Sequence, residues 1–288
     1  INLFYTTRVL NTLIVSAKKV FMPIVLMGLV LVYFGLSVFV WRHTLLNTGK
    51  HYSLKTEALI VTPALIIHGA VLALPVLQDQ VLIMGFGYAL SLIVWLMLLI
   101  YYMGSYFYSL KGLQLLLYPC AAASLTLAAI FPGKTIGYQI SDWPFILHVS
   151  ASLLAYGLFG IATLLAVLIL LLDHSLHKRK FSPLISFLPP LLSLEKLMFQ
   201  VMWAGFMLLS FSVISGTFFA EAVFGQPLNF SHKTVFGILS WLIYAGLLLK
   251  RSMTAWRGKN VAVWTIIGFI SLMLAYVGSK FVLEILLG

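Results

Sequence analysis

The chain has 288 residues, of which 62% are hydrophobic and 9% are charged, and it contains a single cysteine. A water-soluble domain of this length cannot bury so much apolar surface, and one cysteine excludes an internal disulfide or a multi-thiolate metal site. The net charge of +11 does not indicate a nucleic-acid partner, because the basic residues lie in short segments between apolar runs and form no basic stripe with interleaved aromatics. We therefore expect a protein whose main surroundings are the lipid bilayer.

Long apolar runs along the chain predict membrane-spanning helices, whereas an outer-membrane barrel would show short alternating segments. The pattern predicts an all-α, polytopic bundle of about eight transmembrane helices, and the lack of an internal repeat disfavours an inverted-repeat transporter. Residues 1–20 are too short and too polar for a further span, so we expect a peripheral or interfacial extension there and one transmembrane domain over residues 21–288. The predicted spans are Phe21–Trp41, Ala58–Leu77, Val81–Met103, Leu113–Phe131, Phe145–Leu172, Leu197–Ala220, Thr234–Leu249 and Ala262–Leu283.

Basic residues are distributed unevenly between the predicted loops. The loops after spans one, three, five and seven together carry 12 Lys and Arg, whereas the loops after the even spans carry Lys134 and Lys233. The positive-inside rule then predicts a multi-pass protein with the odd loops cytoplasmic and the even loops and the C-terminus outside. In the long loop after span five, Pro189 and Pro190 predict a break followed by a short interfacial helix around Leu191–Lys196.

Charge is scarce within the spans, so each histidine there is a candidate site. His68 lies near the middle of the second predicted span, about 15 Å from its outer end. An ionisable group at that depth marks a functional site by default, and the alternative is a neutral histidine that is hydrogen-bonded to a neighbouring helix. His148 opens the fifth span at the predicted outer face. Ser152 and Tyr156 follow at i+4 and i+8, so they share its side of the helix and are expected to point into the bundle.

The stretch from Leu197 to Leu249 joins two spans through an aromatic connection that contains His232. His232 begins the seventh span at the predicted outer face. Two outer histidines above a buried third suit bis-imidazole haem ligation, because neutral imidazole binds iron. Spacing alone does not show that the three converge, and each outer histidine is also explained by a hydrogen bond at the interface. Four aromatic residues are expected to pack a porphyrin there: Phe218, Phe219, Phe224 and Phe230.

The sequence contains no recognisable arrangement of catalytic residues. Glu221 and Asp142 lie near Lys233 and Lys134 in the predicted outer loops, and exposed pairs of this kind contribute only about 0–1 kcal/mol. We interpret these residues as groups that orient the protein or dock a partner. We therefore expect a protein that binds a ligand without transforming it.

Four blocks of sequence occur in a recognisable order: LHVSASLLAYG, LLSFSVISGTFFAEAVFG, HKTVFGILSWLIYAGLLLKR and AWRGKNVAVWTIIGFISLMLAYVGSKFVLE. In this order they resemble the cytochrome c assembly protein family, the CcsA/CcmC-like haem-handling membrane proteins, and in particular its YpjD/HemX-like inner-membrane branch. The resemblance covers roughly residues 58–288 and implies a location in the bacterial inner membrane. It implies that His148 stands at the position of an outer-face haem ligand and that His68 is similar to the intramembrane ligand of CcsA-type members.

The sequence also departs from the family pattern. The loop before the seventh span, FGQPLNFSHKTVFG, lacks the tryptophans and the aspartate of the family's WWD motif, and His232 falls near the motif's proline. The histidine that CcsA-type members carry after the last span is missing from the final SKFVLEILLG. Haem ligation by His232 is therefore our own hypothesis and is not implied by the resemblance.

These observations predict a membrane protein that binds or handles haem b in cytochrome c-type biogenesis, with metal-ligand candidates His148, His68 and His232. Its expected partners are haem and a membrane protein of cytochrome c maturation. The alternative is a haem-free structural or regulatory inner-membrane subunit that kept the fold and lost the WWD motif. A third possibility, a small-solute transporter, is disfavoured because His68 is the sole ionisable group predicted near the midplane.

Overall fold

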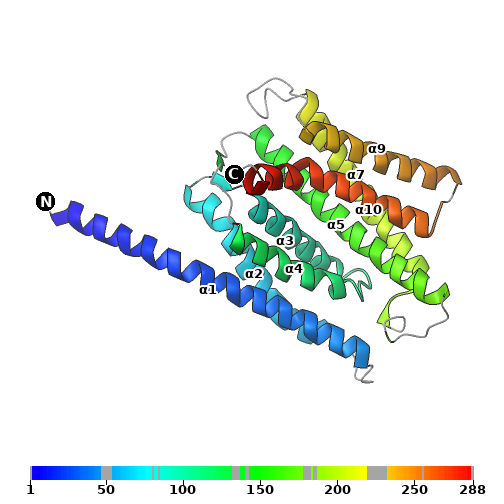
Figure 1. The fold of residues 1–288 in the computed structure, drawn as a ribbon, viewed down its shortest axis with the longest axis horizontal. Helices are drawn as coiled ribbons and strands as arrows, with labels where there is room; N and C mark the ends of the chain where they lie inside the picture. The colour runs from blue at the N-terminus through cyan, green and yellow to red at the C-terminus, as the bar shows by residue number, and fades with distance from the viewer. Residues whose placement is uncertain are drawn as a thin grey trace.

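The computed structural model describes residues 2–46, 54–79, 81–83, 85–131, 137–139, 143–177, 183, 187–218, 232–254 and 256–286. It is a bundle of long helices (Figure 1) with one small two-stranded ribbon. In chain order the long helices are α1 (Asn2–Leu46), α2 (Leu54–Asp79), α3 (Phe86–Gly104), α4 (Gln114–Ile130), α5 (Trp143–His177), α7 (Leu191–Phe218), α9 (His232–Thr254) and α10 (Lys259–Met273).

The expected all-α bundle is confirmed. Within the described residues, seven helices are long and apolar enough to cross a membrane, where α10 is counted together with its continuation to Leu286, and α4, with 17 residues, is a shorter apolar helix. Each predicted span coincides with one of these helices, because a run of apolar residues long enough to cross a bilayer specifies its helix by length and composition alone. The helices lie where the spans were predicted, but some of them begin or end at other residues.

The third span begins later than predicted, because Val81–Ile83 forms strand β1 and does not join the helix. β1 pairs antiparallel with β2 (Gly137–Gln139), with Val81 opposite Gln139. The strand lies in the α2–α3 connection and its partner in the α4–α5 connection. Pairing therefore ties two loops together that were both predicted on the outer face.

Two other segments also differ from expectation. The predicted short interfacial helix after Pro190 is the first part of α7, which runs from Leu191 to Phe218 without a break. The proline pair sets the helix start, and Leu194 and Glu195 are buried in the first turns. At the N-terminus, residues 2–20 are the first part of α1. This part of the helix extends beyond the other helices (Figure 1). Its peripheral or interfacial location stays a prediction.

The core is built around α5, which packs most extensively against α7 and also contacts α3 and α10. Small residues allow this close packing: a Cβ at Gly160 would lie 2.6 Å from the sulfur of Met97 on α3. Helices without a hydrophobic driving force between them associate through such close backbone approach. On the other side, Phe159 stacks on Tyr244 of α9, with 3.8 Å between ring centroids. α2 and α4 pack against α3, and α1 packs against α4 and α2.

The last predicted span is a helix with an altered winding. α10 ends at Met273 and continues as a π-helical segment, η1 (Leu274–Gly278), followed by α11 (Ser279–Phe281) and a second π-helical segment, η2 (Val282–Leu286). π-Helical turns inside α-helices occur frequently at functional sites. η1 packs against α9 and α3 at the end of the bundle where α5 begins.

Candidate functional site: a histidine-lined cavity at one end of the bundle

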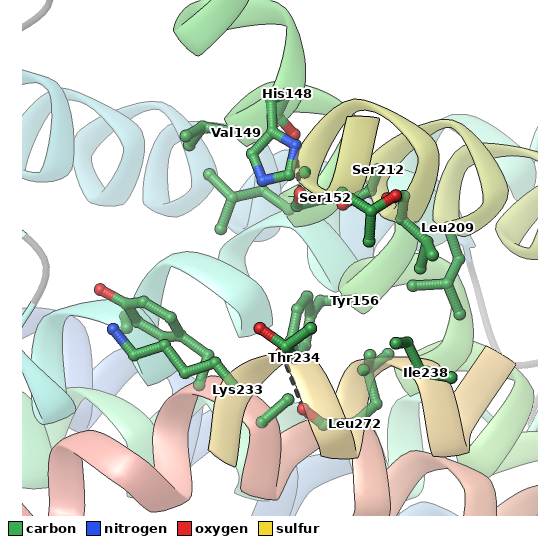
Figure 2. Close-up of a pocket in the computed structure, with 18 of the residues that line it drawn as sticks. His148, Val149, Ser152, Tyr156, Leu209, Ser212, Lys233, Thr234, Ile238 and Leu272 are labelled. Carbon is green, nitrogen blue, oxygen red and sulfur yellow. Dashed lines mark hydrogen bonds between the residues drawn. The ribbon is translucent and has the colours of Figure 1, made fainter. Parts of the chain in front are cut away.

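A cavity of about 260 Å³ lies between the start of α5, the end of α7, the start of α9 and the junction of α10 with η1. His148 projects into it from α5, and Lys233 and Thr234 face it from α9 (Figure 2). Most of the remaining wall is aliphatic or aromatic. The cavity therefore offers an apolar interior with a few polar groups placed around it, the arrangement typical of small-molecule sites.

The imidazole of His148 is oriented by a serine of the neighbouring helix. Its Nδ1 lies 2.8 Å from the hydroxyl of Ser215, and that hydroxyl donates a hydrogen bond of 3.1 Å to the carbonyl oxygen of Ser212. When the single hydroxyl proton is directed to Ser212, Ser215 accepts from Nδ1–H, and in this tautomer the lone pair of the ring is on Nε2. A hydrogen bond to the second ring nitrogen is the way in which metal-binding histidines are oriented in proteins.

The ring of His148 also lies directly against the backbone of α7 at Gly216. A Cβ at Gly216 would be 3.0 Å from Cε1 of His148, which is closer than an ordinary van der Waals contact. The absence of a side chain at Gly216 therefore leaves room for the imidazole against α7. Together with Ser215, it defines where the ring stands.

A chain of hydroxyl groups joins α5 to α7 just behind His148. Ser152 donates to the carbonyl oxygen of His148 over 2.7 Å, and its hydroxyl is 2.6 Å from that of Ser212. Because Ser152 uses its proton in this way, Ser212 is the donor between the two. Ser152 and Tyr156 both line the cavity, so the prediction that the His148 face of the helix points into the bundle is confirmed.

The opposite wall carries the cationic group. The ammonium of Lys233 lies 5.4 Å from the centre of the Tyr276 ring, which belongs to η1, and both residues line the cavity. On the same side, the hydroxyl of Tyr156 donates to the carbonyl oxygen of Leu272 over 2.7 Å. This bond uses a carbonyl group at the point where the regular winding of α10 ends. Sequence reasoning had assigned Lys233 to a loop ion pair and did not expect it in the site.

The cavity end of the bundle is held by the C-terminal turns. Glu284 accepts a hydrogen bond of 2.9 Å from the backbone N–H of Phe86 and lies 3.9 Å from the ammonium of Lys280. A carboxylate at this position interacts favourably with the N-terminus of α3. Since α3 contributes Ala89 and Ile93 to the cavity wall, this contact helps to position that wall.

His68 lies elsewhere in the bundle. It is fully buried, its Nε2 is 2.9 Å from the hydroxyl of Ser91, and its Nδ1 is 3.5 Å from the hydroxyl of Tyr33. Ser91 is two positions from both Ala89 and Ile93, so it faces away from the cavity on the other side of α3. His68 does not line the cavity. The structure therefore does not bring His68 and His148 into one site.

The remaining predicted residues fall around the entrance or outside the described part of the chain. His232 is the exposed first residue of α9, and the cavity wall begins with the next residue, Lys233. Phe218 ends α7 and is 80% exposed. Phe219, Phe224 and Phe230 lie outside the described residues, as do Glu221 and Asp142. Among the described residues, no three His, Cys, Asp or Glu side chains come together as a metal-binding cluster.

The family follows from a direct comparison of sequences. A family model described as "Cytochrome C assembly protein" matches residues 56–287. The chain belongs to the cytochrome c assembly protein family. The match covers the helices that surround the cavity as well as the α2 helix that carries His68.

Individual relatives agree with this assignment. The inner membrane protein YpjD of Escherichia coli K12 is 30% identical over 171 residues, which are 59% of this chain and 64% of YpjD. The cytochrome c biogenesis protein CcsA of Guillardia theta is 29% identical over 156 residues, covering 49% of this chain and 52% of the relative. The CcsA protein of Chlamydomonas reinhardtii is 26% identical over 148 residues, covering 50% and 39%. The chain thus spans less than two thirds of the length of each of these relatives.

Proposed function

We propose that this member of the cytochrome c assembly family binds or handles haem b at the cavity beside His148, in support of cytochrome c-type biogenesis. The observation that carries the proposal is the orientation of His148. Its Nδ1 lies 2.8 Å from the Ser215 hydroxyl, which holds the ring at the wall of the cavity; in the tautomer with the proton on Nδ1, Nε2 is the nitrogen that would bind a metal. Neutral imidazole is the usual proximal ligand of haem iron.

The groups in the cavity wall suit an apolar ligand that carries carboxylates. Apart from His148, the serine and threonine hydroxyls, Tyr156, Tyr276 and Lys233, the lining side chains are apolar. The ammonium of Lys233 supplies a positive charge across the cavity from His148, where it would attract the propionate groups of a porphyrin. The single Cys120 excludes a C-x-x-C-H attachment motif, so the ligand would be bound non-covalently, as haem b is.

Binding and release are sufficient for this function, and we propose no chemical transformation of the ligand by the protein. His148, Ser215 and Gly216 hold the coordinating ring, Lys233 anchors the ligand electrostatically, and the apolar wall excludes water. The positive-inside rule supports an orientation with this cavity at the outer face of the bacterial inner membrane. There, a membrane protein of cytochrome c maturation would be the partner that receives or supplies the ligand.

Haem ligation by His68 and His232 stays a prediction. His68 would have to exchange its hydrogen bond to Ser91 or Tyr33 for a metal bond. His232 would have to reach the cavity from a position one residue outside its wall. The proposal for His148 does not depend on either of them.

Absorption spectroscopy tests the proposal. The protein purified in detergent and reconstituted with haem should show a Soret band and split bands after reduction with dithionite. We expect His148→Ala to lose these bands and the exposed control His174→Ala to retain them. His68→Ala and His232→Ala tell which further histidine, if any, is a ligand, because loss of a bis-imidazole spectrum in one of them identifies it. A featureless wild-type spectrum, or an unaltered one in His148→Ala, would contradict the proposal and favour the haem-free alternative.

A further inference from the structure

A second cavity lies at the opposite end of α7 from the haem-site candidate. Its volume is about 530 Å³, and it is lined by the α3–α4 connection on one side and by the segment that leads into α7 on the other. These two parts of the chain lie at the same end of the bundle (Figure 1). In the sequence they belong to two of the four loops that together carry most of the basic residues, and the structure brings one lysine from each into a single pocket.

The polar groups of this pocket are suited to an anion. Lys111 comes from the α3–α4 connection and Lys196 from α7, and both are exposed. Ser193, Lys196 and Gln200 recur at i, i+3 and i+7, which places them on one face of α7. None of the described residues that line the pocket is acidic. The pocket also lies at the N-terminal end of a 28-residue helix, where the helix dipole favours negative charge.

The surroundings of the pocket indicate the depth of a membrane interface. Three consecutive aromatic residues precede Lys111: Tyr106 is 69% exposed, Phe107 81% and Tyr108 51%. Phe107 and Tyr108 line the pocket itself. Aromatic residues of this kind gather at the level of the lipid headgroups. Free phosphate needs only the cations, whereas a phospholipid also uses the apolar side of the pocket, which Phe187, Leu188 and Leu197 supply.

We propose that this pocket, which we call the basic interfacial pocket, binds the phosphate group of an anionic phospholipid. Lys111 and Lys196 contact the headgroup, the hydroxyl of Ser193 offers a hydrogen bond to a phosphate oxygen, and Phe107 lies against the upper part of the acyl chains. Basic pockets between membrane helices bind anionic lipid headgroups in this manner. The lipid would join the α3–α4 connection to α7, two segments that are distant in sequence. This proposal is independent of haem binding.

Native mass spectrometry of the detergent-purified full chain tests it. The probes are phosphatidylglycerol and phosphatidylcholine with identical acyl chains, and inorganic phosphate serves as the free anion. We expect the wild type to prefer phosphatidylglycerol, and the double variant Lys111→Gln/Lys196→Gln to lose affinity roughly fivefold for each lysine removed. Lys111→Arg/Lys196→Arg, which retains both charges, should bind like the wild type.

Arg257→Gln is the matched control. It removes an exposed positive charge from the α9–α10 turn, which lies at the same end of the bundle because the N–H of Gly258 donates to Glu195 of α7 over 2.9 Å. Arg257 does not line the pocket, so we expect this variant to bind phosphatidylglycerol like the wild type. Equal losses in Arg257→Gln and in the double variant, or no loss in the double variant, would overturn the proposal. Displacement of phosphatidylglycerol by inorganic phosphate at constant ionic strength would assign the pocket to free phosphate and overturn the lipid assignment.

Discussion

His68 and His148 make similar hydrogen bonds to serine hydroxyls, but their rings lie in different surroundings. Each imidazole lies within 2.9 Å of a serine hydroxyl from another helix, Ser91 for His68 and Ser215 for His148. The second nitrogen of His68 meets Tyr33, and the residue is fully buried. His148 instead borders a cavity of about 260 Å³. The His–Ser pair at His68 thus lies in a fully packed contact between helices, whereas the pair at His148 orients its ring toward a cavity.

Helix α3 separates these two environments. Its Ser91 faces His68, while Ala89 and Ile93 face the cavity. An imidazole packed between helices contributes to stability, whereas an imidazole beside a cavity can contribute to binding. Four substitutions test this comparison, and they follow from the largest expected effect to the smallest.

His68→Ala should cause the largest change in stability. The substitution leaves Ser91 and Tyr33 without their buried partner and opens a cavity among α1, α2 and α3. We expect the free energy of unfolding to fall by about 3 kcal/mol. Reversible unfolding in mixed detergent micelles, followed by circular dichroism, measures this difference. The exposed His174→Ala should change it by less than about 0.5 kcal/mol, and an equal loss in the two variants would show that His68 has no special structural role.

Ser215→Ala should affect binding at the other histidine. Without the hydroxyl, Nδ1 of His148 loses this hydrogen-bond partner, which holds the orientation of the ring. Loss of such an outer hydrogen bond typically weakens metal binding by about tenfold or more. Haem titration followed by the Soret band measures the affinity. Ser252→Ala, at the exposed end of α9, is the control, and unaltered affinity in Ser215→Ala would contradict the assigned orientation.

Gly216→Ala changes the space around His148 without removing a hydrogen bond. The added Cβ would lie 3.0 Å from Cε1 of the ring, so the imidazole must shift toward the cavity. Strain of this kind costs about 1 kcal/mol at the lower end of its range, and we expect a roughly fivefold loss of haem affinity. Gly246→Ala on α9, where a Cβ meets no atom within 4 Å, should not weaken binding. If both variants bind equally well, Gly216 does not set the position of the ring.

Lys233→Gln should have the smallest effect, and its signature is salt dependence. The lysine is partly open to solvent at the cavity, so its attraction for carboxylates is worth at most about 1 kcal/mol. We expect a loss of a few-fold in haem affinity at low salt, which shrinks as the ionic strength rises. The matched control is Lys259→Gln at the start of α10, which does not line this cavity. A loss that is independent of salt would show that Lys233 acts through packing.

A large part of the fold was predictable from hydropathy alone. The eight apolar runs correspond to eight helices, because each run is long enough to satisfy all backbone hydrogen bonds within itself in an apolar medium. The start of α3 was misplaced, since Val81–Ile83 are as apolar as the helix that follows them and their pairing with β2 depends on a loop far away in the sequence. The continuity of α7 was missed for a similar reason: burial of Leu194 and Glu195 depends on neighbouring helices.

For the candidate site, helical periodicity correctly predicted the shared face of His148, Ser152 and Tyr156, because residues at i, i+4 and i+8 lie on one side of a helix whatever its neighbours are. Periodicity could not place one helix next to another. Only the tertiary structure put Ser215 and Gly216 against His148, brought Lys233 to the opposite wall and set α3 between His148 and His68. Composition and local spacing thus determined the helices and their inward faces, while interhelical packing decided which histidine meets a cavity, since the space around a side chain depends on residues that are distant in the chain.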